Sequence, residues 1–192
     1  NLQNVDLSKA ITVSSSAFEN AKGLGEIELT NAKTIGSFAF RNSDITKVNA
    51  PIVLMLDEGA FAECRSLEEL SAENVITVFK GVFKECTSLI TAKLPLATTL
   101  GNDVFYNSSL KYIVLPVTTI LGNNVFAGCQ NPKAVSLPEA GKVGTNTFRD
   151  CKAMTILYLP KLTSLDYSVF SNCEQLKSLW LPQVKSVGSN AF

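Results

Sequence analysis

The sequence contains no histidine, and this absence excludes more chemistry than any other feature of its composition. Without histidine, the Ser–His and Cys–His pairs that activate a nucleophile cannot form. The five cysteines include no Cys-x-x-Cys pair, so the usual spacing of a zinc site is missing as well. The acidic neighbours Asp57-Glu58 and Glu68-Glu69 are typical of solvated surface charge. Composition therefore predicts no enzyme, no metal site and no cofactor.

Charge is also scarce and evenly balanced. Charged residues make up 18% of the chain, with 17 Lys and Arg against 17 Asp and Glu. A net charge of zero without a basic tract argues against nucleic acid or an anionic membrane as the main partner. No apolar run approaches the ~18–20 residues that cross a bilayer. We therefore expect no nucleic-acid partner and no membrane insertion of this segment.

The sequence does contain a repeat that covers its whole length. One phenylalanine closes each copy, and successive copies lie 21 or 22 residues apart. The closing residues are Phe18, Phe40, Phe61, Phe83, Phe105, Phe126, Phe148, Phe170 and Phe192. A fixed period of this size indicates a solenoid, in which each repeat forms one rung and packs only on its neighbours.

Each copy begins with a short strand, as in Leu157-Tyr158-Leu159-Pro160. Two apolar residues separated by one other residue indicate a period-2 strand with both apolar side chains pointing inward. The pattern predicts nine such strands, the first at Val5 and Leu7, stacked in one parallel sheet. Proline follows in six copies and marks the end of the strand, because proline cannot donate to a sheet ladder.

A second buried segment and a corner follow the strand. The corner residue is Gly in five copies and Asp in two, which would suit a left-handed backbone, but Phe79 occupies the same place. Because a bulky residue with positive φ is an outlier, we favour a corner that does not require positive φ over a strained rung. A helical turn is predicted to carry the closing phenylalanine, whose ring should point inward and stack along the axis.

The cysteines all lie three residues after a closing phenylalanine, at Cys64, Cys86, Cys129, Cys151 and Cys173. Asn42 and Asn107 are predicted to fill the same inward position in the two 21-residue copies, which would leave the Asn107-Ser108-Ser109 sequon unmodified. Cys64 and Cys86, in neighbouring rungs, could lie within disulfide range. We favour five free buried thiols, because the total is odd and the positions face inward.

The unit L-x-x-L-x-L-P…[IV]-G-x-x-[AV]-F-x-x-C resembles the bacterial leucine-rich repeats of the BspA type, also called the Treponema pallidum type. The resemblance covers essentially the whole chain, although Thr30 and Glu73 replace the proline in two copies. It implies a leucine-rich-repeat solenoid, a right-handed curved superhelix with a parallel β-sheet on the concave face and short strands and helical turns on the other side. It also implies an extracellular or cell-surface protein with an adhesin-like role, and it brings no catalytic motif.

The outward residues of the predicted sheet change character along the chain. The N-terminal half is polar and acidic, whereas five residues of the C-terminal half are aromatic or aliphatic: Tyr112, Val114, Ile156, Tyr158 and Trp180. Exposed aromatic clusters are common at recognition sites, so these five are the candidate ligand-binding residues. Alternatively, strands simply favour aromatic residues, or further repeats cover the patch.

We therefore expect residues 1–192 to form a single leucine-rich-repeat domain of about nine rungs, as part of a longer protein. The first functional hypothesis is a non-catalytic binding module that recognises a host or matrix protein, or a glycan, through its concave sheet. The second is a structural spacer without a ligand of its own, and an enzyme on a repeat scaffold comes third. Bare terminal rungs could also allow end-to-end self-association.

Overall fold

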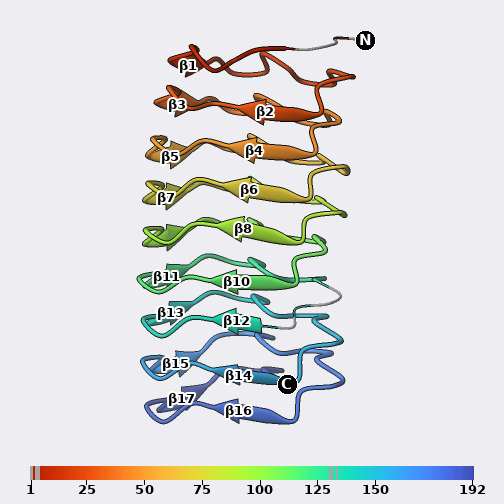
Figure 1. Cartoon of the computed structure of the whole chain (residues 1–192). Helices are drawn as coiled ribbons and strands as arrows, with labels where there is room; N and C mark the ends of the chain where they lie inside the picture. The colour runs from red at the N-terminus through yellow and green to blue at the C-terminus, as the bar shows by residue number, and fades with distance from the viewer. Residues whose placement is uncertain (1, 3–4, 130–131, 133) are drawn as a thin grey trace.

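The computed structural model describes residues 2, 5–129, 132 and 134–192, and it is a stack of similar rungs (Figure 1). A complete rung contains a strand of three residues and, after a turn, a strand of two residues. Each element is too short to be stable alone, so the rungs stabilise one another. The predicted parallel-strand solenoid is confirmed.

The three-residue strands form what we call the front sheet. They are β2 (Glu26–Glu28), β4 (Lys47–Asn49), β6 (Glu69–Ser71), β8 (Thr91–Lys93), β10 (Tyr112–Val114), β12 (Ala134–Ser136), β14 (Ile156–Tyr158) and β16 (Ser178–Trp180). Pairing is continuous from β2 to β12, and β14 pairs separately with β16. Each strand is parallel to the next and offset by one repeat, as in the pairing of Tyr158 with Trp180.

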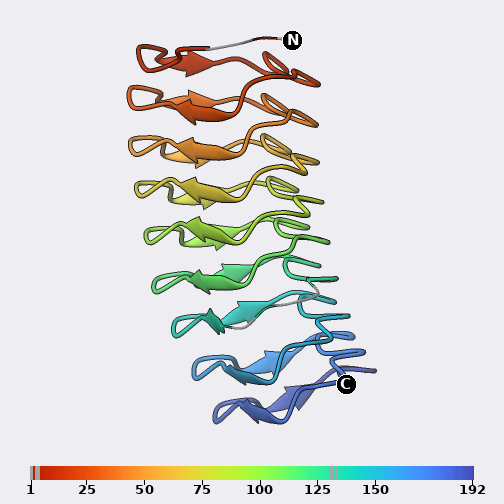
Figure 2. The same ribbon diagram turned by 45° about the vertical axis from the view of Figure 1, so that its right-hand side comes forward.

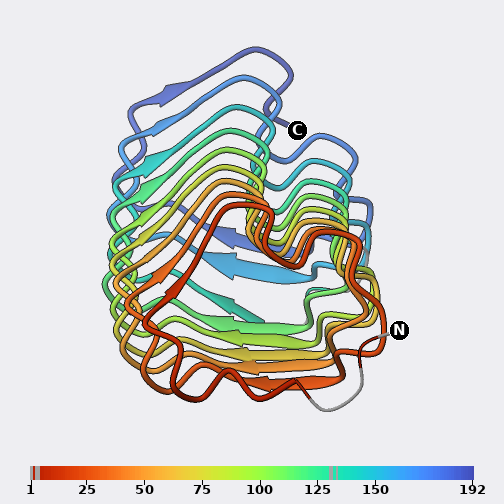
Figure 3. The same ribbon diagram turned by 90° about the horizontal axis from the view of Figure 1, so that it is seen from above.

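The two-residue strands form a second sheet, the side sheet. They are β1 (Thr12–Val13), β3 (Thr34–Ile35), β5 (Met55–Leu56), β7 (Thr77–Val78), β9 (Thr99–Leu100), β11 (Ile120–Leu121), β13 (Lys142–Val143), β15 (Ser164–Leu165) and β17 (Ser186–Val187). Pairing is continuous from β1 to β13, and β15 pairs with β17. Seen along the stack, the two sheets occupy different sides of each rung (Figure 3).

The closing phenylalanines form a continuous ladder through the core, as predicted. From Phe18 to Phe170 the ring centroids of neighbouring rungs lie 5.2–5.9 Å apart, and the ring planes differ by at most 10°. Phe40, Phe83 and Phe126 are among the fully buried side chains. The ladder therefore fixes the spacing of the rungs from inside.

The cysteine thiols form a second internal ladder. Each Sγ donates a hydrogen bond to the carbonyl oxygen of a phenylalanine in the preceding rung, as in Cys64 to Phe40 (2.9 Å) and Cys129 to Phe105 (3.1 Å). All five cysteines are free thiols, and all but Cys173 are buried. The thiols thus satisfy backbone acceptors inside the core, a weak but geometrically specific role.

The asparagine prediction for this position is wrong. Ser43 and Ser108, not Asn42 and Asn107, fill the inward place in the two shorter copies, and both serines are buried. Asn107 is exposed, and Asn42 donates from Nδ2 to Oδ1 of Asn20 at 2.7 Å on the outside of the turn. Each 21-residue copy is one residue shorter at another place in the repeat. The inward residue therefore stays three positions after the phenylalanine, as in the cysteine copies.

The predicted helical turn is also replaced by a different structure. No helix is present in the described ranges, and the segment around each phenylalanine is a series of turns, stacked along the right-hand side of Figure 2. The residues two before and two after the phenylalanine have positive φ, as in Asn146 (57°) and Asp150 (58°) around Phe148. A left-handed residue every four positions interrupts an α-helix, and asparagine, aspartate and glycine tolerate that conformation best.

Glycine stands at the corner because a side chain has little room there, not because the backbone has a positive φ. The phenylalanine at position 79 already suggested that positive φ is not required. Gly36 and Gly101 are not among the residues with positive φ. A Cβ atom on Gly101 would lie 2.9 Å from the backbone of Phe79 and Lys80 in the preceding rung. Close approach of the two backbones therefore explains glycine at this corner.

The predicted first strand at Val5 and Leu7 is not formed, so among the described residues the front sheet has eight strands rather than nine. Asp6 accepts a hydrogen bond from the Ser8 backbone N–H at 2.9 Å, which bends the chain locally. The Ser8 carbonyl in turn accepts from the side chains of Thr30 and Asn31. Side-chain bonds thus replace strand pairing between the first two rungs here.

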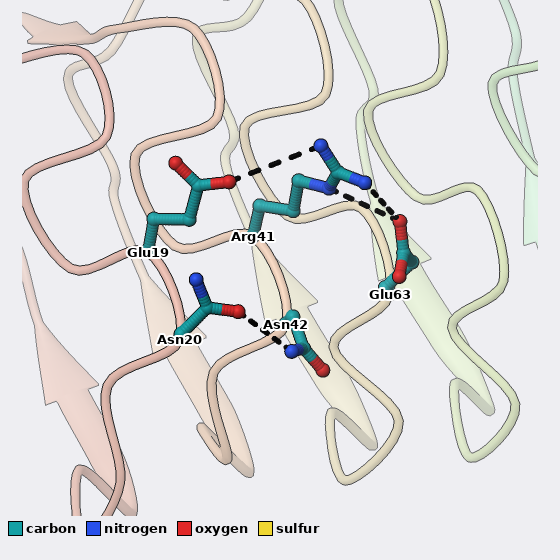
Figure 4. A network of polar contacts seen from close by, with 5 residues as sticks. All are labelled: Glu19, Asn20, Arg41, Asn42 and Glu63. Atoms are coloured by element: carbon teal, nitrogen blue, oxygen red, sulfur yellow. Dashed lines mark hydrogen bonds and ion pairs between the residues drawn. The ribbon is translucent and has the colours of Figure 1, made fainter.

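Polar side chains on the turns connect the first rungs from outside (Figure 4). The Arg41 guanidinium donates from Nε and Nη2 to Oε1 of Glu63, at 3.0 and 2.8 Å, and lies 3.8 Å from Glu19. These side chains are partly exposed, so each ion pair contributes little to stability, on the order of 0–1 kcal/mol. Internal packing is therefore the main stabilising contribution.

Candidate binding surface on the front sheet

The five candidate residues all point outward from the front sheet, as predicted. Tyr112 and Val114 lie on β10, Ile156 and Tyr158 on β14, and Trp180 on β16. Between them, each strand points one residue toward the core: Ile113 and Leu157 are buried and Leu179 is partly buried. The five outward side chains are 48–68% exposed, which leaves their apolar surface available for contact.

Tyr158 and Trp180 form one compact aromatic unit. The two residues are paired partners on β14 and β16, and their ring centroids lie 6.3 Å apart at an interplanar angle of 70°. This edge-to-face arrangement is a favoured geometry for two aromatic rings. Both side chains are more than half exposed, so the ring surface outside the pair can receive an apolar group or the face of a sugar ring.

Tyr112 and Val114 belong to a separate part of the surface. The strand β12 lies between β10 and β14, so the two groups are about 10 Å apart at ~4.8 Å per strand. Ser136, the outward residue of β12 beside Val114, is polar and exposed. The structure therefore places the five residues on one sheet face but in two clusters.

A hollow of about 300 Å³ accompanies the first cluster. Its lining includes Tyr112 and Val114 together with Pro95 and Pro116, which end the strands β8 and β10, and Lys93 and Glu73 stand at its margin. Sequence reasoning placed the two β10 residues but missed the prolines as lining residues. The signal was present, because the prolines follow the strands at the same place in each rung.

The N-terminal half of the front sheet is charged and mostly paired internally. Lys47 Nζ lies 3.5 Å from Oε1 of Glu26, and Asn49 donates from Nδ2 to Glu28 at 2.8 Å. A second hollow of about 170 Å³ lies over these strands and extends to Lys93. The side chains of Glu26, Glu28, Lys47 and Asn49 thus have partners in the chain, so fewer polar groups of this half are free to bind a ligand.

The described residues show no arrangement suited to covalent or metal chemistry on this face. In the parts of the chain with described coordinates, no three Cys, Asp or Glu side chains gather as metal ligands. Burial raises the pKa of the Cys64 and Cys129 thiols to about 11, so both remain protonated and inside the core. The exposed side chains of this face offer aromatic and apolar surface.

Sequence comparison identifies the repeat. The family model for the BspA type leucine rich repeat region matches in six copies, over residues 1–99 and 98–192. The chain belongs to this family. The BspA-type repeat thus accounts for the regular phenylalanines, the inward cysteine position and the proline at the strand end. A comparison with curated proteins gives no significant match.

Solved structures agree with the fold. The T. pallidum Leucine Rich Repeat protein is 21% identical with a TM-score of 0.56, over 93% of this chain and 66% of that one. A leucine-rich repeat protein from Eubacterium ventriosum is 17% identical with a TM-score of 0.55, over 96% and 74%. A leucine rich cell surface protein from Faecalibacterium prausnitzii is 16% identical with a TM-score of 0.42, over 91% and 83%. At these identities, the T. pallidum and Eubacterium ventriosum structures show a likeness of fold alone. Among the described residues there is no long apolar helix of the kind that crosses a bilayer.

Proposed function

We propose that this BspA-type array is a non-catalytic binding module that is displayed outside the cell and recognises a host or matrix protein, or a glycan. The observation that carries the proposal is the edge-to-face pair of Tyr158 and Trp180, exposed on the front sheet. Aromatic residues dominate binding energy at interfaces, and a rigid sheet limits the entropy lost on binding. The hollow beside Tyr112 supplies a second contact point on the same face.

The structural-spacer hypothesis is the alternative, and a specific observation bears on the choice. A spacer needs only the inward residues of the repeat, which are nearly uniform from rung to rung. The outward positions are not uniform: the column that contains Tyr158 and Trp180 carries Glu28, Asn49 and Ser71 in earlier rungs. Large aromatic side chains in water are unnecessary for a spacer, so their presence favours recognition.

The test is binding of the purified chain to an immobilised panel of matrix proteins and glycans. Replacing Tyr158 and Trp180 together by Ser, a residue that the same column carries at Ser71 and Ser136, should reduce saturable binding at least tenfold. The melting temperature should remain nearly unchanged, because both side chains lie outside the core. Saturable binding that survives the double substitution would exclude this patch, and no saturable binding to any probe would favour the spacer.

A further inference from the structure

The asparagine of the Asn107-Ser108-Ser109 sequon is exposed on the turn that carries Phe105. The prediction that this sequon stays unmodified rested on an inward Asn107, and the buried Ser108 takes that place instead. The Asn107 backbone N–H donates to the Ala127 carbonyl of the next rung at 2.9 Å, so backbone atoms and Ser108 hold the rung in place. The side chain of Asn107 is left out of this packing.

The amide nitrogen of Asn107 differs from the equivalent nitrogens of other rungs. Two residues after a closing phenylalanine, Asn42 donates from Nδ2 to Oδ1 of Asn20 in the preceding rung at 2.7 Å. Asn172 donates in the same way to Oδ1 of Asp150 at 2.8 Å. Within the described ranges, no such bond from Nδ2 of Asn107 is present. A group attached to this nitrogen would therefore displace no hydrogen bond of the fold.

The next rung leaves room for this amide. A Cβ atom on Gly128, the equivalent residue of that rung, would lie 2.0 Å from Oδ1 of Asn107. The amide oxygen is thus packed over a glycine. Because the oxygen and the nitrogen leave Cγ in different directions, the nitrogen points away from this contact. The crowded end of the amide is therefore its oxygen, and the nitrogen is the accessible end of this exposed residue.

The repeat accounts for Asn107 but not for the serine that completes the sequon. Asn107 has a φ of 52°, and asparagine is one of the residues that tolerate a left-handed backbone. Ser109 stands four residues after the closing phenylalanine, where other copies carry Arg65, Lys152 and Glu174. A position that accepts side chains of either charge is not fixed by the fold. The complete sequon is found in this copy alone.

We propose that Asn107 is an acceptor for an N-linked oligosaccharide. The donor is an oligosaccharide joined through a pyrophosphate to a membrane lipid. Nδ2 forms a bond to C1 of the first sugar, the bond from C1 to the pyrophosphate oxygen breaks, and one Nδ2 proton passes to a base of the transferase. The lipid pyrophosphate leaves with the bonding electrons, so no oxidant or reductant is required. The proposal rests on the proposed display outside the cell, because the transferase meets only chains that cross a membrane.

The glycan is added before this rung closes. In the folded chain, the Ser109 hydroxyl donates to the Thr87 carbonyl of the preceding rung at 2.6 Å. A sequon requires this hydroxyl as well as the asparagine, so an engaged Ser109 presents an incomplete signal to the transferase. After folding, the glycan stands on the turn side, and the turn segments occupy a different side of each rung from the front sheet (Figure 3). The modification therefore leaves the proposed binding surface uncovered.

The experiment is secretion of the chain, behind a cleavable signal peptide, from a eukaryotic cell line that attaches N-linked glycans. The intact mass before and after treatment with peptide-N-glycosidase counts the glycans. We expect one glycan per chain and conversion of Asn107 to aspartate by the enzyme. N107Q and S109A should each abolish the added mass. S109T keeps the hydroxyl and should retain the glycan, and N42Q, at an equivalent asparagine without a sequon, should retain it as well.

The stability of the product tests the structural argument. The glycosylated and the enzymatically deglycosylated chain should have nearly equal melting temperatures, because Nδ2 of Asn107 has no bond to lose. A secreted chain without a glycan, a glycan that persists in N107Q, or a glycan that markedly lowers the melting temperature would overturn the proposal. Secretion of N107Q without secretion of the wild type would also overturn it, because the glycan would then prevent folding. Translation with microsomes gives the same mass readout where no variant is secreted.

The outcome is separable from that of the binding proposal. Binding of N107Q to the panel of matrix proteins and glycans should equal that of the wild type, because the turn side and the front sheet are different surfaces. Loss of the glycan without loss of binding would confirm this separation. A glycosylated chain that binds no probe would remove the binding proposal and leave the modification site in place.

Discussion

The hydroxyl of Ser43 lies 3.6 Å from the thiol of Cys64, because the two residues occupy equivalent positions in consecutive rungs. Ser108 and Cys129 repeat this relationship at 3.4 Å. In both pairs the cysteine also donates to a phenylalanine carbonyl of the preceding rung. The position therefore selects a small side chain with a donor, and either sulfur or oxygen satisfies it.

The first prediction follows from this equivalence. Cys129→Ser should keep a donor near the Phe105 carbonyl and cost less than about 1 kcal/mol of unfolding free energy. Cys129→Ala removes the thiol donor, while the Phe105 carbonyl keeps its hydrogen bond from the Ser108 backbone N–H at 3.0 Å. The lost bond and the lost sulfur volume should together cost about 1–2 kcal/mol. Urea unfolding of the two variants measures the difference. Equal costs for both would show that the position selects size alone.

A second prediction concerns alkaline pH. Burial raises the pKa of the Cys129 thiol from its ordinary value of 9.0 to about 11. A group with a raised folded-state pKa contributes its full stability below the unfolded-state pKa and loses it as pH rises through the folded-state pKa. Stability should therefore decline between about pH 9 and 11, by roughly 2–3 kcal/mol for this thiol.

Serine does not ionise in this range, so C129S isolates the contribution. The difference in unfolding free energy between C129S and the wild type should shift in favour of C129S as pH rises from 9 to 11. Tyrosine and lysine titrations are common to both proteins and cancel in the difference. A difference that is independent of pH would mean that this thiol ionises with an ordinary pKa in the folded protein.

The sequence predicts the features of this structure that depend on side-chain periodicity better than those that depend on backbone conformation. The Phe40–Phe61 stacking and the outward position of Trp180 follow from period and alternation, so the sequence was sufficient. The turns around Phe148 were predicted as helical. The positive φ at Asn146 and Asp150 interrupts a helix, and it is a backbone property that no side-chain pattern states directly. Asn107 was assigned inward because the shorter copies were taken to have lost a residue just after the phenylalanine. Counting three residues from Phe105, as in the cysteine copies, selects Ser108.

For the candidate surface, the sequence likewise predicted the direction of the side chains but not their grouping. Alternation placed Tyr112, Tyr158 and Trp180 on one face, because side-chain direction in a strand depends only on position parity. The separation of these residues into two clusters depends on β12 and on the break in pairing after it. The outward residues of the side sheet were not predicted, since strands of two residues are too short to give an alternating pattern.

The third prediction tests the phenylalanine ladder. Phe105 is fully buried and stacks on Phe83 and Phe126, at 5.2 and 5.5 Å. Phe105→Ala should cost about 3–5 kcal/mol, because the loss of a buried ring leaves a cavity between rungs. Phe192→Ala is the matched control: its ring is 68% exposed and stacks only on Phe170, so its loss should cost far less. Thermal or urea unfolding of both variants provides the test, and similar costs would contradict a dominant internal ladder.

The last prediction concerns Gly59 and Phe38, which occupy the same left-handed position in neighbouring rungs, with φ of 59° and 57°. A Cβ atom on Gly59 would lie 2.5 Å from the Phe38 ring, so Gly59→Ala adds both left-handed strain and a steric clash. We expect a cost of about 2–3 kcal/mol in the wild type. Phe38→Asn removes the ring and supplies the residue found at Asn124 and Asn146, which tolerates positive φ.

In the Phe38→Asn background, only the strain of Gly59→Ala remains, so its cost should fall to about 1 kcal/mol. Phe38→Asn alone should be nearly neutral, because relief of strain offsets the loss of the contact with Arg41, whose Cζ lies 5.7 Å from the ring centroid. Urea unfolding of the four proteins gives the coupling energy, which we expect to exceed about 1 kcal/mol. Additivity within about 0.5 kcal/mol would show that the Phe38 ring moves aside freely, and that strain alone keeps glycine at this position.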